Sequence, residues 1–230
     1  AQWSSVYSTR LSVTESQERY ETQPSAYVTT TRLRGYTLQN ELRFGRHLLS
    51  AALERKEDRL ENDPINRGRS QNALALGYGF TDKRHTVQLN LRHDRDSEFG
   101  GKTTGSAAYA YAFTPAWRAT ASMGTAFRAP TLYQRFSEYG VATLVPETSR
   151  NIELGLRWAQ GASSLGLTAY RNKVNNLITY VDGASTCASF WGCYANTAHA
   201  QYSGITLSAA HALNGVNLTA SLDLQNPHDV

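Results

Sequence analysis

The sequence predicts an all-β chain that folds as an antiparallel up-and-down meander of about 11 strands. Three observations lead to this prediction. Apolar and polar side chains alternate with a period of two along most of the 230 residues. Short turns and long polar segments alternate between these stretches. Large aromatic side chains lie beside the short turns, on the apolar face of their strands.

The alternation also predicts where each strand lies. In the second strand, for example, Leu38, Leu42 and Phe44 share one face, and Glu41 and Arg43 share the other. The expected strands, in order, are 3–15, 29–44, 47–59, 71–80, 84–95, 105–113, 117–126, 149–159, 163–175, 203–213 and 216–226. Several exceed the five or six residues usual in soluble proteins. Tilted strands of about ten residues or more are what a membrane-spanning barrel requires.

The connections between these strands differ in length. Short turns are expected at 45–46, 81–84, 114–116, 160–163 and 213–215. Long polar segments are expected at 16–28, 59–70, 94–104, 126–148 and 175–202. Short turns at one end and long loops at the other are typical of a transmembrane barrel. A soluble β-sandwich is the alternative, because its solvent-facing surface is polar as well.

The aromatic side chains favour the membrane barrel. Those expected to form an outward ring at the membrane–water boundary are Phe44, Phe80, Phe113, Trp117 and Trp158. The pattern makes a definite prediction about two faces. One should carry Tyr109, Phe113, Trp117, Leu154 and Trp158, and the other should carry Arg118, Glu153 and Arg157.

An odd number of meandering strands makes the first and last strands parallel. Single-chain bacterial barrels close with an even number of antiparallel strands, so this sheet should have two open edges. We therefore expect residues 1–230 to be part of a larger barrel domain.

Composition excludes several functions. A net charge of +4, spread evenly, does not indicate a nucleic-acid-binding protein. The sequence has no recognisable nucleophile, nucleotide-binding or paired-histidine motif, so we expect no enzyme, no metal and no cofactor. Acidic and basic residues are intermixed at 54–58 and 93–98, which indicates a solvated wall of the barrel or the base of a loop. A calcium site is the alternative.

Two cysteines, Cys187 and Cys193, lie in the segment GASTCASFWGCY at 183–194. A metal site would need further ligands nearby, and a redox motif would have a shorter spacing. A loop-closing disulfide is the preferred interpretation, with two free thiols as the alternative. A disulfide implies an oxidising compartment outside the cytosol.

Two linked motifs carry a resemblance to a known family. Residues 124–133 read GTAFRAPTLY, and residues 145–155 read VPETSRNIELG. Together they resemble the paired motifs of TonB-dependent outer-membrane receptors. AYRNKVNNLI at 169–178 and YSGITL at 202–207 are similar to two further family segments, although Thr206 stands where the family often has Glu. Within the family, the sequence looks most like the cobalamin transporters of proteobacteria.

The resemblance implies an antiparallel barrel of about 22 strands in the outer membrane of a Gram-negative bacterium, with a plug domain inside it. It implies that TonB drives uptake of a large, scarce nutrient, most readily cobalamin. Residues 1–230 would then be the middle of the barrel, without the plug domain and the C-terminal strands. A ferric-siderophore or haem receptor is the first alternative. A barrel enzyme and a structural or adhesive β-protein are alternatives of other classes.

The candidate ligand-binding residues lie at the predicted extracellular mouth: Thr29, Thr31, Arg128, Tyr133, Arg135 and Tyr139. An arginine there can pair with a phosphate or carboxylate of the ligand, and a tyrosine can stack on a planar macrocycle. The threonines can donate hydrogen bonds. The alternative for the loop residues is a solvated position or contact with lipopolysaccharide and other outer-membrane lipid.

Overall fold

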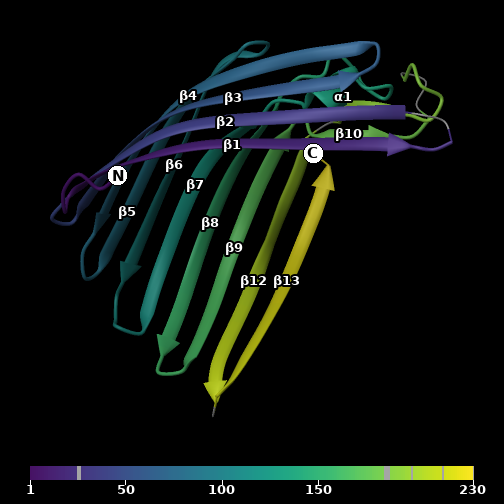
Figure 1. Ribbon diagram of the computed structural model, residues 1–230. Helices are drawn as coiled ribbons and strands as arrows, with labels where there is room; N and C mark the ends of the chain where they lie inside the picture. Colours follow the sequence, from purple (N-terminus) through teal and green to yellow (C-terminus); the bar gives the residue numbers. More distant parts are fainter. Residues whose placement is uncertain (25–26, 184–186, 198, 214, 230) are drawn as a thin grey trace.

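The structure is a computed structural model that describes residues 1–24, 27–183, 187–197, 199–213 and 215–229. It contains one large antiparallel sheet, which curves into an open trough (Figure 1). The first strands are β1 (Tyr7–Thr22), β2 (Tyr27–Phe44), β3 (His47–Asn62), β4 (Ile65–Thr81), β5 (His85–Asp96) and β6 (Gly100–Ala112). The remaining strands of this sheet are β7 (Trp117–Arg128), β8 (Glu147–Gln160), β9 (Ser163–Asn175), β12 (Ala200–Leu213) and β13 (Val216–Asp229).

The sheet has 11 strands, each hydrogen-bonded to its neighbour in the order β1-β2-β3-β4-β5-β6-β7-β8-β9-β12-β13. The predicted meander is therefore confirmed. Strands β1 and β13 form the two edges and run in the same direction, toward the end that carries the long loops (Figure 1). Within the described residues the sheet does not close into a complete barrel.

The register confirms the predicted faces. Trp117 pairs with Trp158, and Arg118 pairs with Arg157, so apolar residues pair with apolar ones and charged residues with charged ones at these positions of β7 and β8. Side chains directly opposite each other in a ladder point to the same face, and a slip of one residue would exchange every one of them. Tyr109 reaches Leu154 on the same face through Ala121.

Aromatic side chains form a band beside the short turns on the apolar face, as predicted. Phe44 stacks on His47 with ring centroids 5.0 Å apart, and His47 lies 5.1 Å from the Phe80 ring. Phe113 stacks on Trp117 at 6.3 Å. Tyrosine and tryptophan favour the level of the lipid headgroups, where a ring has an apolar body and a polar tip. We call the apolar face the lipid face and the opposite face the lumen face.

The strands extend further into the loop end than the hydropathy pattern predicts. Three expected long segments, 16–28, 59–70 and 94–104, are largely strand, and the connections between β1–β2, β3–β4 and β5–β6 are short. The prediction was wrong because beyond the bilayer both faces meet water, so hydropathy stops alternating while the ladder of hydrogen bonds continues. Cross-strand ion pairs support this extension, as between Arg69 of β4 and Asp96 of β5 at 3.6 Å.

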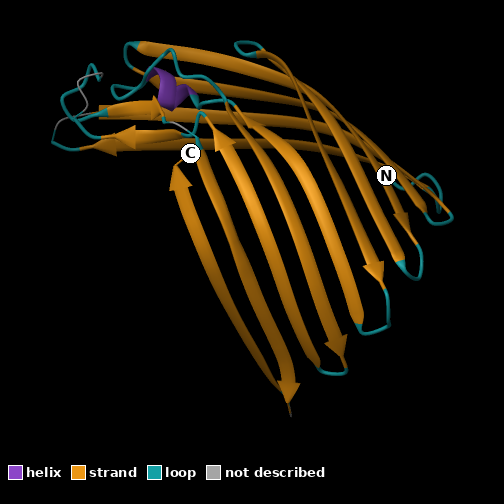
Figure 2. Ribbon diagram, turned by 180° about the vertical axis from the view of Figure 1, so that it is seen from behind, coloured by secondary structure: helices purple, strands orange, loops and turns teal. Residues whose placement is uncertain are grey.

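Two connections are long, and both contain structure that the sequence pattern did not predict. The segment after β7 contains the short helix α1 (Leu132–Phe136). The segment after β9 contains a hairpin of β10 (Ile178–Val181) and β11 (Cys193–Asn196). Figure 2 shows both at the same end of the trough, away from the short turns. No helix among the described residues is long and apolar enough to cross a membrane.

Most buried apolar side chains of the described chain lie beneath these two connections. Leu60, Leu132, Leu144 and Ile178 are between 0% and 7% exposed, whereas the large apolar side chains of the lipid face are mostly exposed. Burying apolar surface stabilises the loops by roughly 25 cal/mol per Å². The two long connections, after β7 and after β9, therefore form a folded cap over part of the trough, which we call the loop cap.

Candidate functional site

The base of the loop cap is an ion pair at the end of β7 and the start of β8. Arg128 and Glu147 are partners in the ladder. The guanidinium of Arg128 binds the carboxylate in a two-pronged fashion, with N–O distances of 2.5 and 2.6 Å. Glu147 is 8% exposed, and it also accepts a hydrogen bond of 2.7 Å from the backbone N–H of Ile178. One carboxylate thus joins β7, β8 and the start of the hairpin.

The electrostatics of this pair follow from its contacts. Burial raises the pKa of Glu147, but the hydrogen bonds from Arg128 and Ile178 outweigh it, so the pKa lies below its ordinary value. The hydrogen bond to Glu147 raises the pKa of Arg128. Arg128 is thus held as a cation at the loop base, with its side chain 55% exposed.

Helix α1 begins with a capping box. The hydroxyl of Thr131 accepts a hydrogen bond from the Gln134 N–H, and the Gln134 side chain accepts one from the Thr131 N–H. Pro130, directly before it, is fully buried, and its carbonyl accepts a hydrogen bond of 2.6 Å from Arg69. Arg69 also pairs with Asp58 at 2.5 Å. These contacts anchor the helix to β3 and β4.

Arg135 anchors the other side of the helix. Its guanidinium forms an ion pair with Glu98 and donates two hydrogen bonds, of 3.1 and 2.9 Å, to the carbonyl of Ala142. It also lies over the rings of Phe99 and Phe136, at 4.9 and 4.7 Å from their centroids. The side chain is 14% exposed. These contacts give Arg135 a positioning role, and direct ligand binding by it stays a prediction.

The two long connections meet in a group of tyrosine rings, which we call the tyrosine cluster. Its edge-to-face contacts join Tyr133 to Tyr194 at 6.2 Å, Tyr194 to Tyr180 at 5.6 Å, and Tyr180 to Tyr139 at 5.8 Å. The backbone N–H of Tyr194 donates to the carbonyl of Tyr139 at 3.0 Å. Such ring geometry is the favoured one for aromatic pairs.

The cluster extends to the lumen face of β2 through Tyr27. Burial is the main cause that raises the pKa of Tyr133, and interaction with the Tyr27 hydroxyl raises it further. Interaction with the Glu138 carboxylate raises the pKa of Tyr139 to about 12. Both phenols are therefore neutral at physiological pH. A neutral, aromatic surface of this kind can stack on a planar ring and donate to its polar edge.

The threonines of β2 lie on the same lumen face as Tyr27. Thr29 is 5% exposed, and its hydroxyl accepts a hydrogen bond from the Asn62 side chain. Thr31 lies two residues further along β2, away from the loop end, and is half-buried. Of these two residues, Thr31 is thus the more available for a ligand.

The hairpin of β10 and β11 is tied down by Asn196. Its side-chain oxygen accepts from the Val145 N–H at 2.9 Å, and its nitrogen donates to the carbonyls of Val145 and Asn176 at 2.9 and 2.7 Å. The side-chain amide of Asn196 thereby forms with the Val145 backbone the pair of hydrogen bonds that a neighbouring strand would otherwise form. The hairpin, the segment before β8 and the end of β9 become one unit.

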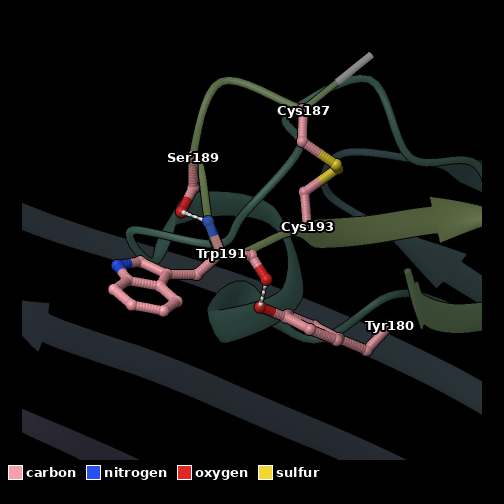
Figure 3. The surroundings of a disulfide bond; sticks show 5 residues. All are labelled: Tyr180, Cys187, Ser189, Trp191 and Cys193. Carbon is pink, nitrogen blue, oxygen red and sulfur yellow. Dashed lines mark hydrogen bonds between the residues drawn. A yellow bond between two sulfur atoms is a disulfide. The ribbon is translucent and has the colours of Figure 1, made fainter. Parts of the chain in front are cut away.

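The tip of the hairpin carries the cysteines (Figure 3). Cys187 and Cys193 form a disulfide, with their Cα atoms 5.4 Å apart. The Tyr180 hydroxyl donates to the carbonyl of Trp191 at 2.8 Å. The side chains of Trp191 and its neighbour Phe190 are 72% and 86% exposed, and their rings contact each other edge to face. The disulfide holds an exposed aromatic pair above the tyrosine cluster.

Gly192 has a conformation that this tip requires. Its φ is +119°, and an added Cβ would lie 2.3 Å from the carbonyl oxygen of Val181. Any side chain there would clash with the backbone of β10. Glycine at this position lets the chain turn into Cys193.

Sequence reasoning found part of this site. It named Tyr133 and Tyr139, which the structure brings together, but it missed Tyr27, Tyr180 and Tyr194. Tyr27 has the same strand parity as Thr29 and Thr31, which was a usable signal. Tyr180 and Tyr194 flank the cysteine loop, but nothing local shows that this loop packs against α1. Among the described residues, no group of three or more His, Cys, Asp or Glu side chains could hold a metal ion.

A family model described as TonB dependent receptor-like, beta-barrel, matches residues 2–227. The chain belongs to the TonB-dependent receptor family. It is 31% identical over 144 residues to the vitamin B12 transporter BtuB of Vibrio cholerae serotype O1, and the match covers 62% of this chain and 23% of that protein. The chain therefore spans less than a quarter of the curated relatives it matches.

Solved structures show the same fold. The siderophore receptor PirA from Pseudomonas aeruginosa superposes with a TM-score of 0.70 at 21% identity, over 94% of this chain and 48% of that one. The copper transporter OprC superposes with a TM-score of 0.75 at 16% identity, over 99% and 45%. These proteins are receptors and transporters, not enzymes. Membership of the family places the chain in the outer membrane of a Gram-negative bacterium.

Proposed function

We propose that the receptor containing this chain imports cobalamin, with the tyrosine cluster as part of its extracellular binding surface. In this proposal residues 1–230 are a section of the barrel domain. The remaining strands and a plug domain belong to the rest of the receptor, and TonB supplies the energy through the plug.

The observation that carries the proposal is the tyrosine cluster beside the lumen face. Cobalamin is a planar macrocycle with amide groups around its edge. Neutral tyrosines offer ring faces to the macrocycle and hydroxyl groups to the amides. The similarity to a vitamin B12 transporter over 144 residues supports the same ligand class. Arg128 and Arg135 hold the two connections in place and so keep the cluster assembled.

A titration of the full receptor with cyanocobalamin, followed by tryptophan fluorescence, tests the ligand. Trp191 is exposed at the tip of the hairpin and serves as the reporter. We expect saturable quenching with cyanocobalamin and none with an iron chelate. Tight binding of a ferric siderophore without any binding of a corrinoid would replace cobalamin with the alternative that the solved siderophore receptors raise.

A pair of variants tests the cluster. Tyr133→Leu combined with Tyr139→Leu removes two rings, and each aromatic contact contributes about 0.5–1.5 kcal/mol, so we expect affinity to fall roughly tenfold. Tyr109→Leu is the matched control, because Tyr109 lies on the lipid face among the aromatic side chains near the short turns. Equal affinities for the double variant and the control would show that the cluster is not part of the binding surface.

A further inference from the structure

The lipid face carries charge at its loop end, above the apolar side chains of the strands. On β1, β2 and β3 the arginines of this region form ion pairs within the sheet. Arg34 pairs with Glu15 at 3.2 Å, Arg55 with Glu57 at 2.8 Å, and Arg59 with Glu61 at 3.0 Å. These arginines therefore have their counter-charges beside them.

At the same height on β8 and β9, the charged side chains of the lipid face are all basic. Arg150 and Lys173 are direct partners in the ladder, and Arg171 is two positions along β9 on the same face. All three side chains are exposed. Like charges directly opposite each other in a sheet destabilise it. We call Arg150, Arg171 and Lys173 the cationic cluster.

Among the described residues, no carboxylate forms an ion pair with the cationic cluster. None of the described lipid-face positions of β7, β8, β9, β12 and β13 is Asp or Glu, as the register of these strands shows. The structure gives Arg150 and Lys173 no ion pair among the described residues. Arg171 donates two hydrogen bonds, of 2.9 and 2.6 Å, to the side-chain oxygen of Gln201, which is neutral. The positive charge is therefore left to a group outside the described chain.

The position of the cluster indicates what that group is. Directly below it on the same face lie Ile152, Leu154 and Leu167, each more than 40% exposed, which face the acyl chains. A group that contacts both the apolar side chains and the cluster must be apolar below and anionic above. A phosphorylated lipid of the outer leaflet has this form, and arginine binds phosphate oxygens with paired hydrogen bonds.

We propose that Arg150, Arg171 and Lys173 form a binding site for the phosphate group of an outer-leaflet lipid, of which lipopolysaccharide is the expected one. The site is on the outside of the barrel and is separate from the ligand surface on the lumen side. It fixes one lipid against β8 and β9, where the two long connections begin and end.

The test is a titration of the detergent-solubilised full receptor with bisphosphorylated lipid A, with bound lipid measured by native mass spectrometry. The variant combines Arg150→Gln, Arg171→Gln and Lys173→Gln. Because each basic side chain near an anionic headgroup contributes severalfold, we expect a loss of affinity on the order of 100-fold. The matched control combines Arg34→Gln, Arg55→Gln and Arg59→Gln, which removes the same charge from ion-paired positions. We expect it to bind almost as the unaltered receptor does.

Further arms separate the sources of phosphate. Lipid A without its phosphates should bind no better to the unaltered receptor than to the cluster variant, and inorganic phosphate should not displace the lipid. Equal loss in the control, full binding of dephosphorylated lipid, or displacement by inorganic phosphate would each overturn the proposal. Lys173→Gln alone, with a severalfold loss expected, replaces the triple variant if that variant does not fold. Unchanged binding by Lys173→Gln would also count against the site.

Discussion

Glu147 is the residue whose loss should disturb the loop cap most. The Glu147→Gln variant leaves the guanidinium of Arg128 without its counter-charge and weakens the contact with Ile178. A broken buried pair costs about 3–5 kcal/mol, and the exposure of Arg128 reduces this to about 2 kcal/mol. We expect faster hydrogen exchange at the Ile178 amide, with the amides of β5 as an internal control. Unchanged exchange at Ile178 would contradict this role.

The lowered pKa of Glu147 predicts that the stability of the receptor depends on pH. Its pKa is lowered in the folded protein, so its stabilising contribution is fully present above the ordinary value of 4.5. The contribution is lost as the pH falls through the lowered value in the folded state. Thermal unfolding of the receptor at pH 7 and below pH 4 should therefore show a larger acid loss for the unaltered protein than for Glu147→Gln. Equal losses would mean that Glu147 is not linked to stability.

At the scale of the elements, strand β7 offers a test of register on two adjacent residues. Ala121 lies on the lipid face, opposite Leu154, and Ser122 lies on the lumen face, opposite Glu153. An arginine at the lipid-facing position should cost about 2–4 kcal/mol near the middle of the bilayer. Ala121→Arg should reduce folding of the receptor into lipid vesicles, and Ser122→Arg should be tolerated. Equal tolerance of both would refute the face assignment.

The hairpin of β10 and β11 makes a prediction about the cysteines. Closing so short a loop restricts the unfolded chain and contributes about 2–3 kcal/mol. Mass spectrometry of protein prepared without reductant should find no free thiol at Cys187 or Cys193. Reduction, or Cys187→Ser with Cys193→Ser, should make the bond beside the exposed Trp191 sensitive to protease. Two free thiols in the untreated protein would exclude the disulfide.

At the scale of the whole molecule, the described sheet has two edges with unpaired backbone groups and an exposed apolar face. Such edges template strand pairing, and apolar patches beyond a few hundred Å² drive association. The 25.4 kDa chain on its own should therefore associate in water or require detergent. Light scattering in both conditions measures this. A clean, stable monomer in water would contradict the view that the sheet is one section of a larger barrel.

Sequence alone determined the number of strands in the main sheet, their order along the chain, the short turns and the face of the side chains within the predicted strands. These features are local, because the period of two repeats within each strand and the bilayer imposes one apolar face on all of them. It also placed Tyr133, Tyr139 and the threonines of β2 at the same end.

Only the tertiary structure decided which of these residues meet. Contacts such as Arg135 with Glu98, or Tyr133 with Tyr194, join segments far apart in sequence, and no periodic pattern encodes them. Non-local pairing also explains why the hydropathy pattern predicts loops at the polar ends of β1 to β6. Once both faces of a strand are in water, hydropathy carries no signal, and only the pairing of neighbouring backbones maintains the strand.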